Sequence, residues 1–253
     1  MIGDRVLVTG SSGFVGSHLV PFLSENYPAV DLLCTDVHPH TPKSSHEDQN
    51  HVQLDLLDFD AVIHLVESFR PTTVIHLASM SSVAESWDSP IQSFANNTGV
   101  FLNLLEALRA ASPTARILSI GSSEEYGDIS PEELPLTEES PLGPVSPYVV
   151  ARVSQELISK VYVDGYGMDI VMTRSFNHIG PGQDSRFVIP SFVKQVTAAK
   201  LAGGSSIAIR TGDISIVRDF TDVRDVVRAY LLLLETPQTR GKIYNVCSGR
   251  GLV

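Results

Sequence analysis

Short apolar runs bounded by turn residues recur along the chain, and amphipathic stretches lie between them. Strands are expected at residues 6–9, 31–35, 51–54, 73–76, 116–120 and 169–174. Helices are expected at residues 14–25, 59–69, 91–110 and 147–165. Strands that alternate with helices in this way are typical of βαβ units. The pattern therefore predicts an α/β fold of the Rossmann type, built on a doubly wound parallel sheet.

The pattern loosens after residue 174 into glycine- and proline-bearing loops, short strands and one helix near residues 222–234. We therefore expect two parts, a Rossmann domain at residues 1–174 and a small lobe at residues 175–253 that is interleaved with the last sheet elements. The polar stretch at residues 38–50 predicts a mobile loop.

Composition narrows the class of protein. The chain has 253 residues, 43% hydrophobic and 19% charged, which is typical of a globular domain with one large core. Its formal net charge of −11 argues against a nucleic-acid partner, which would need a clustered basic face. Cys34 and Cys247 are far apart, so we expect two buried thiols and neither a disulfide nor a metal site.

The N-terminal residues enter the first predicted strand almost at once, and the longest apolar run, near Tyr230, is far too short to span a bilayer. We therefore expect no signal peptide, no membrane partner and a cytoplasmic protein.

Glycines punctuate the turn between the first strand and the first helix. Gly10, Gly13 and Gly16 permit a tight turn, a close backbone approach to a pyrophosphate and close packing of the helix on the strand. The backbone N–H groups at Phe14 and Val15 would then face the phosphates at the helix N-terminus. A plain strand–helix turn is the alternative, but the position after a strand favours a dinucleotide site.

Asp36 lies at the end of the second predicted strand, twenty residues beyond Gly16. A carboxylate there accepts both hydroxyls of an adenosine ribose and repels a 2′-phosphate, so the sequence predicts NAD in preference to NADP. An ordinary surface aspartate is the alternative. Asp55 and Leu56 follow the third strand and are candidates for the adenine edge, although a strand-terminal turn explains them equally well.

A second group of polar residues is expected at the carboxyl edge of the sheet. Ser122 and Ser123 follow the strand at residues 116–120, and Tyr148 and Arg152 share one face of the next helix because they are four residues apart. A cation about 5 Å away would stabilise a phenolate by roughly 3 kcal/mol, which suits Tyr148 to proton transfer. The alternative is an amphipathic helix whose tyrosine packs and whose arginine reaches solvent.

Several motifs together resemble the extended short-chain dehydrogenase/reductases. They are TGSSGFVG at 9–16, HLA at 76–78, Asn97, SSEEYG at 122–127 and SPY at 146–148. Two more, RSFNHIGPGQ at 174–183 and VRDFTDVRD at 217–225, resemble the branch that acts on GDP-linked deoxy sugars. The likeness runs over nearly all of the chain.

The resemblance implies roles for individual residues. Ser122 would hydrogen-bond the sugar oxygen, Tyr148 would be the acid/base, and Glu124 matches a glutamate that removes a proton in the dehydratases of this family. Ser123, Asn177 and Arg218 would bind the nucleotide sugar, with Arg218 on the diphosphate. The alternatives are a strand-edge surface charge for Arg218 and a turn residue for Asn177. The resemblance adds further cofactor-binding residues, which are Leu77, Ala78, Asn97, Tyr148 and Arg152.

The sequence departs from the family pattern in two respects. Arg152 stands where the family has lysine, and a planar guanidinium does not reproduce the geometry of an ammonium. Relatives continue for several dozen residues past the segment at 244–249, so the C-terminal substrate lobe is expected to be incomplete.

The resemblance implies a reductase that delivers hydride from a nicotinamide to the C4 ketone of a GDP-linked 4-keto-6-deoxy sugar. A dehydratase or 4-epimerase that keeps NAD bound is the alternative, and a non-catalytic protein that binds a dinucleotide or sugar nucleotide is a further one. A homodimer that packs residues 91–110 and 147–165 into a four-helix contact is also implied.

Overall fold

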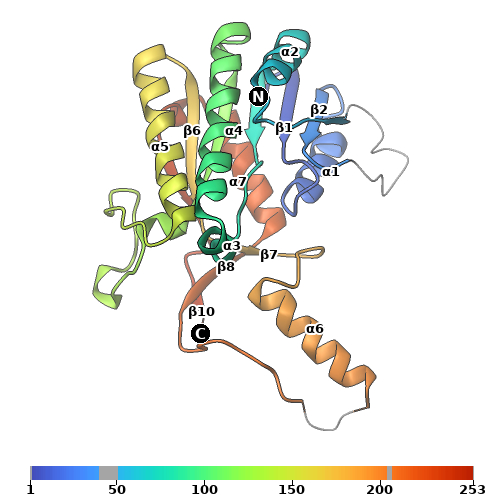
Figure 1. The fold of residues 1–253 in the computed structure, drawn as a ribbon, viewed down its shortest axis with the longest axis vertical. Helices are drawn as coiled ribbons and strands as arrows, with labels where there is room; N and C mark the ends of the chain where they lie inside the picture. Colours follow the sequence, from blue (N-terminus) through green and yellow to red (C-terminus); the bar gives the residue numbers. More distant parts are fainter. Residues whose placement is uncertain (1, 40–50, 204–206, 253) are drawn as a thin grey trace.

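The computed structural model describes residues 2–39, 51–203 and 207–252. A seven-stranded parallel sheet with the order β3-β2-β1-β4-β5-β6-β9 forms its centre (Figure 1). The strands are β1 (Arg5–Thr9), β2 (Asp31–Asp36), β3 (His51–Gln53), β4 (Thr73–His76), β5 (Arg116–Ser122), β6 (Asp169–Ser175) and β9 (Ile243–Val246). The order reverses between β1 and β4, which places a ligand crevice at the carboxyl ends of these strands.

Helices cover both faces of this sheet because strands buried on both sides must be shielded from water. One face packs against α2 (Phe59–Phe69), α4 (Pro90–Ala111) and α5 (Pro147–Tyr166). The other packs against α1 (Gly16–Asn26) and α7 (Val223–Glu235). The two hydrophobic cores lie on opposite sides of the sheet and hold it rigid beneath the crevice. The predicted Rossmann fold is thus confirmed.

The segments after residue 174 divide between two places. Helix α7 and strand β9 return to the large sheet, whereas β7 (Asn177–Ile179), β8 (Arg218–Asp222) and β10 (Gly251–Leu252) form a small second sheet. Helix α6 (Val188–Leu201) extends away from the large sheet, and within the described residues none of its side chains is buried (Figure 1). This second sheet and α6 lie below the carboxyl edge of the large sheet in that view.

Some expectations need correction. The sequence pattern did not predict α6, because Pro190 interrupts the helical pattern. Proline is nevertheless tolerated in the first turn of a helix, where its missing N–H would have had no partner. The short helix α3 (Val83–Asp88) was also missed. Cys247 is exposed, not buried, because it lies just past the end of β9, whereas Cys34 is buried as expected.

The predicted mobile loop at residues 38–50 falls mostly outside the described residues. Within the described part of the chain, no helix combines the length and the apolarity needed to cross a membrane.

Candidate active site

The turn between β1 and α1 depends on the absence of side chains. Gly10 has a φ of +69°, and a Cβ on it would lie 2.5 Å from the backbone nitrogen of Ala78. A Cβ on Gly16 would overlap the backbone oxygen of Ser11. No side chain caps α1, and the N–H groups of Phe14 and Val15 meet no acceptor among the described residues. Unpaired donors at a helix N-terminus suit a pyrophosphate.

Asp36 connects the end of β2 to this turn. Its carboxylate accepts hydrogen bonds from the backbone N–H groups of Ser12, at 3.1 Å, and His38, at 3.0 Å. The side chain is therefore fixed beside the glycine-rich turn, where an adenosine ribose would lie. Asp55 instead accepts from the N–H of Leu57 at 2.9 Å, and the side chain of Leu56 is buried in the core. These two contacts are those of a strand-terminal turn.

The segment after β4 forms the other wall of the crevice. The N–H of Leu77 donates to the carbonyl of Thr9 at 3.0 Å, and this bond holds the two strand ends together. Asn97 is buried in α4, and its amide both donates to and accepts from the backbone of Met80. Asn97 thus shapes the wall that carries Leu77 and Ala78, and its own polar atoms are already engaged.

Ser122 ends β5 and caps the 3-10 turn η1 (Ser123–Tyr126). Its Oγ accepts from the N–H of Glu124 at 3.2 Å, and its own N–H donates to Oε1 of Glu125 at 2.7 Å. The Ser122 hydroxyl hydrogen donates to no acceptor among the described residues, so it is available for a ligand. Ser123 and Glu124 are half-buried beside it.

Tyr148 and Arg152 meet on the buried face of α5, which begins where Ser146 caps the helix by accepting from the N–H of Val149. The Nε of Arg152 donates to the Tyr148 hydroxyl at 3.2 Å, and Nη1 donates to the carbonyl of Ile120 at 3.1 Å. Both side chains are almost fully buried. The helical spacing and the packing against β5 therefore bring the phenol and the cation into direct contact.

Two ionisable groups near this pair were not predicted as part of the site. Burial, aided by the charge of Arg152, lowers the pKa of His76 to about 3, so its ring is neutral and shares a hydrogen bond with Thr9 at 2.8 Å. Burial, with the nearby Glu156 carboxylate, raises the pKa of Glu125 to about 8 against opposing hydrogen bonding from Ser122. The S-x-x-E spacing of Ser122 and Glu125 is a capping-box signal that could have found Glu125.

Replacing Glu125 with glutamine should make the chain more stable at pH 8 while changing little near pH 5. In the folded chain the carboxyl keeps its proton up to a pKa of about 8, whereas the unfolded chain releases it near the ordinary pKa of 4.5. Unfolding therefore releases a proton between these values, and stability falls as the pH rises through this window. Thermal unfolding across this range measures the effect, and parallel pH profiles for the two proteins would contradict it.

The substrate-lobe candidates lie on the small sheet. Asn177 begins β7 and pairs with Phe220, and Arg218 begins β8 with its side chain exposed. The rings of His178 and Phe14 stack at 5.9 Å with an interplanar angle of 7°. This contact packs the segment that carries Asn177 against the glycine-rich turn.

The NAD dependent epimerase/dehydratase family matches residues 6–247. The chain belongs to this family. It is 37% identical to GDP-6-deoxy-D-mannose reductase of Pseudomonas aeruginosa over 98% of the chain and 75% of the relative. It is 30% identical to GDP-mannose 4,6-dehydratase of Yersinia enterocolitica over 92% of the chain and 65% of that relative.

Solved structures of the family superpose on the whole fold. The RMD protein of Pseudomonas aeruginosa complexed with NADPH has a TM-score of 0.83 and 36% identity, over 98% of this chain and 77% of the other. The UDP-glucose 4-epimerase of Thermus thermophilus in complex with NAD also has a TM-score of 0.83, with 32% identity over 98% and 79%. The resemblance to the extended family is thus confirmed, and the family is nicotinamide-dependent.

Proposed function

We propose that this chain reduces the C4 ketone of a GDP-linked 4-keto-6-deoxy hexose. The observation that carries the proposal is the hydrogen bond from Arg152 Nε to the Tyr148 oxygen. Arg152 also bonds the Ile120 carbonyl near the end of β5, the strand that Ser122 completes at the carboxyl edge of the sheet. The likeness to GDP-6-deoxy-D-mannose reductase supports the choice of substrate.

The residues of the chain divide the proton chemistry between them. A bound reduced nicotinamide supplies the hydride. The Ser122 hydroxyl donates a hydrogen bond to the ketone oxygen, since its hydrogen has no other acceptor among the described residues while its oxygen accepts from the N–H of Glu124. The Tyr148 oxygen accepts from Arg152, which leaves its own hydrogen free to protonate the alkoxide. The guanidinium then faces the phenolate that remains, and this charge contact favours the transfer.

A dehydratase or 4-epimerase is the second candidate, and the position of Glu124 favours it. This carboxylate side chain is half-buried next to Ser122, where a base could remove a proton beside a ketone. A non-catalytic binding protein is the third candidate, and Arg152 in place of a lysine supports it.

Incubation with defined substrates separates the three. The proposal expects oxidation of a reduced nicotinamide with GDP-4-keto-6-deoxymannose, and a 6-deoxy-hexose product identified by mass and NMR. Water loss from GDP-mannose with NAD, and no net oxidation, would favour the dehydratase. Binding of dinucleotide without turnover of either sugar would favour the non-catalytic protein.

We infer that NAD is the preferred cofactor, because the Asp36 carboxylate is fixed where a 2′-phosphate would have to lie. NADH should bind at least about tenfold more tightly than NADPH, a difference of about 1.4 kcal/mol. Asp36→Ser should narrow this gap, since it removes the repelling charge. Fluorescence titration of each reduced dinucleotide measures both affinities. Tighter binding of NADPH by the unmodified chain would exclude this role for Asp36. The related RMD protein was solved in complex with NADPH, so the two outcomes must be distinguished by measurement.

We also propose that the chain forms a homodimer through α4 and α5. Apolar side chains at helical spacing are exposed on both helices, including Ile91, Leu102, Leu157 and Val161. Several exposed apolar side chains on two neighbouring helices are typical of a subunit interface. Leu157→Asp should shift the protein to a monomer in light scattering, whereas Leu201→Asp on α6 should not. A mass that is unchanged by the first substitution would contradict the proposal.

A further inference from the structure

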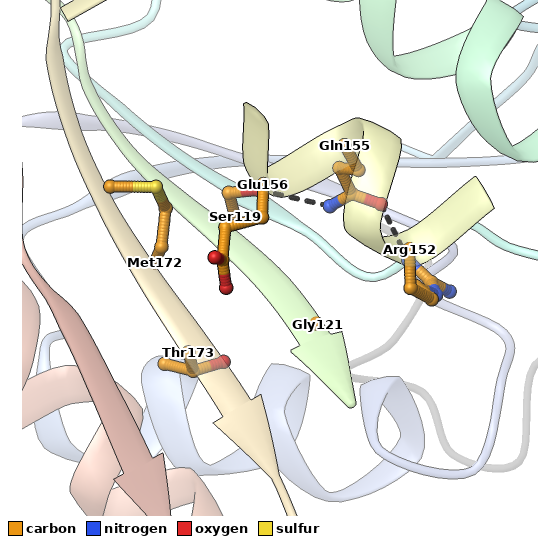
Figure 2. Close-up of a pocket in the computed structure, with 7 residues that line it drawn as sticks. All are labelled: Ser119, Gly121, Arg152, Gln155, Glu156, Met172 and Thr173. Atoms are coloured by element: carbon orange, nitrogen blue, oxygen red, sulfur yellow. Dashed lines mark hydrogen bonds between the residues drawn. The ribbon is translucent and has the colours of Figure 1, made fainter. Parts of the chain in front are cut away.

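Gln155 lies one helical turn after Arg152 and is almost fully buried. Its Oε1 accepts from Nη1 of Arg152 at 2.6 Å, and its Nε2 donates to Oγ of Ser119 at 2.9 Å (Figure 2). The same Nε2 also donates to the carbonyl of Ile120 at 3.2 Å. Both ends of the amide are therefore engaged, and the strand β5 fixes which end faces the guanidinium.

The guanidinium of Arg152 is held at three points. Nε donates to Tyr148, and Nη1 donates to both Ile120 and Gln155. Because a guanidinium is planar and rigid, an acceptor that fixes Nη1 also fixes the direction of the Nε–H bond. Nη2 donates to no acceptor among the described residues, so the plane has no further anchor on that side. Gln155 thus lies where it can control the contact with the phenol.

The packing around Arg152 leaves its guanidinium little freedom to adopt another orientation. Arg152 and Gln155 line a small pocket between α5 and the strands β5 and β6, together with Ser119, Gly121, Met172, Thr173 and Glu156, whose carboxylate is already paired with Arg174 (Figure 2). Apart from the Nη2 side, the guanidinium is surrounded by backbone and packed side chains. Loss of the Gln155 acceptor would leave a buried N–H of a cation without a partner, which costs more than a lost surface hydrogen bond. The guanidinium is then expected to turn away from Tyr148.

We propose that Gln155 is a positioning residue that adapts this site to an arginine at position 152. It holds the guanidinium so that Nε–H donates to the Tyr148 oxygen. An ammonium has no plane to orient, so Gln155 exerts no such control when residue 152 is lysine. This inference rests on the proposed proton-transfer role of Tyr148 for its effect on turnover, but the hydrogen-bond geometry that it predicts can be measured without turnover.

The kinetic test places Gln155→Met in the unmodified chain and in Arg152→Lys. In the unmodified chain, kcat for ketone reduction should fall at least about tenfold while KM and cofactor affinity change less than about threefold. In the Arg152→Lys chain the same substitution should change kcat less than about twofold, because the group that Gln155 orients is gone. An equal loss in both chains, or no loss in the unmodified chain, would overturn the inference.

The direct test follows the Nε–H groups by ¹⁵N NMR. The Arg152 signal is assigned by its loss in Arg152→Lys, and the buried Arg174, which donates to Glu156 at 2.8 Å, supplies an internal control. Gln155→Met should remove or shift the Arg152 signal and leave that of Arg174 unchanged. Gln155→Glu, which keeps an acceptor oxygen for Nη1, should retain it. An Arg152 signal that is unaffected by Gln155→Met would overturn the inference, whereas the predicted NMR result without reductase turnover would refute only the proposed function.

Discussion

Replacement of Tyr148 by phenylalanine should lower turnover by about 100-fold or more and leave dinucleotide affinity nearly unchanged. The phenol is buried and its oxygen accepts from Arg152, so no other hydroxyl at this point of α5 can take its place. Hydride transfer to a ketone stalls when the developing alkoxide receives no proton. The ring itself is retained, so packing against α5 is preserved.

Steady-state kinetics and a fluorescence titration of NADH measure the two quantities separately. Tyr166→Phe is the matched control, because this tyrosine is exposed at the end of the same helix. Turnover that survives Tyr148→Phe would show that Tyr148 only packs, and that the acid is another group.

Gly16→Ala should weaken dinucleotide binding by at least about tenfold, which corresponds to about 1.4 kcal/mol. A methyl group at this position overlaps the backbone oxygen of Ser11, and a backbone atom cannot move aside as a flexible side chain can. The glycine-rich turn must therefore shift, and its N–H donors move away from the pyrophosphate.

Titration of NADH measures the loss, and circular dichroism checks that the chain stays folded. Gly212→Ala is the control, because a Cβ there meets nothing within 4 Å. Unchanged affinity in Gly16→Ala would mean that the dinucleotide does not depend on this turn.

The sequence predicts the sheet well because each strand carries its own signal. The six strands expected up to residue 174 are present, and the seventh, Ile243–Val246, was given no range because four residues carry little periodicity. Helix α6 was also missed, because Pro190 in its first turn argues against a helix in the sequence pattern.

In the candidate site, too, contacts between residues close in the sequence could be predicted, whereas contacts between distant residues could not. Tyr148 and Arg152 could be paired from a spacing of four residues, and the structure places them in contact. Glu125 could have been found from its capping-box spacing to Ser122. Gln155 could not be assigned from spacing, because its partners Ser119 and Ile120 come from the packing of α5 on β5. Asn97 stays a predicted cofactor contact, and its hydrogen bonds to the backbone of Met80 could not be foreseen from the sequence.

The central claim is that the chain transfers a hydride to a sugar ketone and that Tyr148 supplies the accompanying proton. The most direct test is incubation of GDP-4-keto-6-deoxymannose with NADH that carries deuterium at the transferable position, followed by NMR and mass analysis of the sugar. The account predicts one deuterium at C4 of the product and one oxidised nicotinamide for each sugar reduced. A sugar without deuterium, with the nicotinamide still reduced at the end of the reaction, would contradict it.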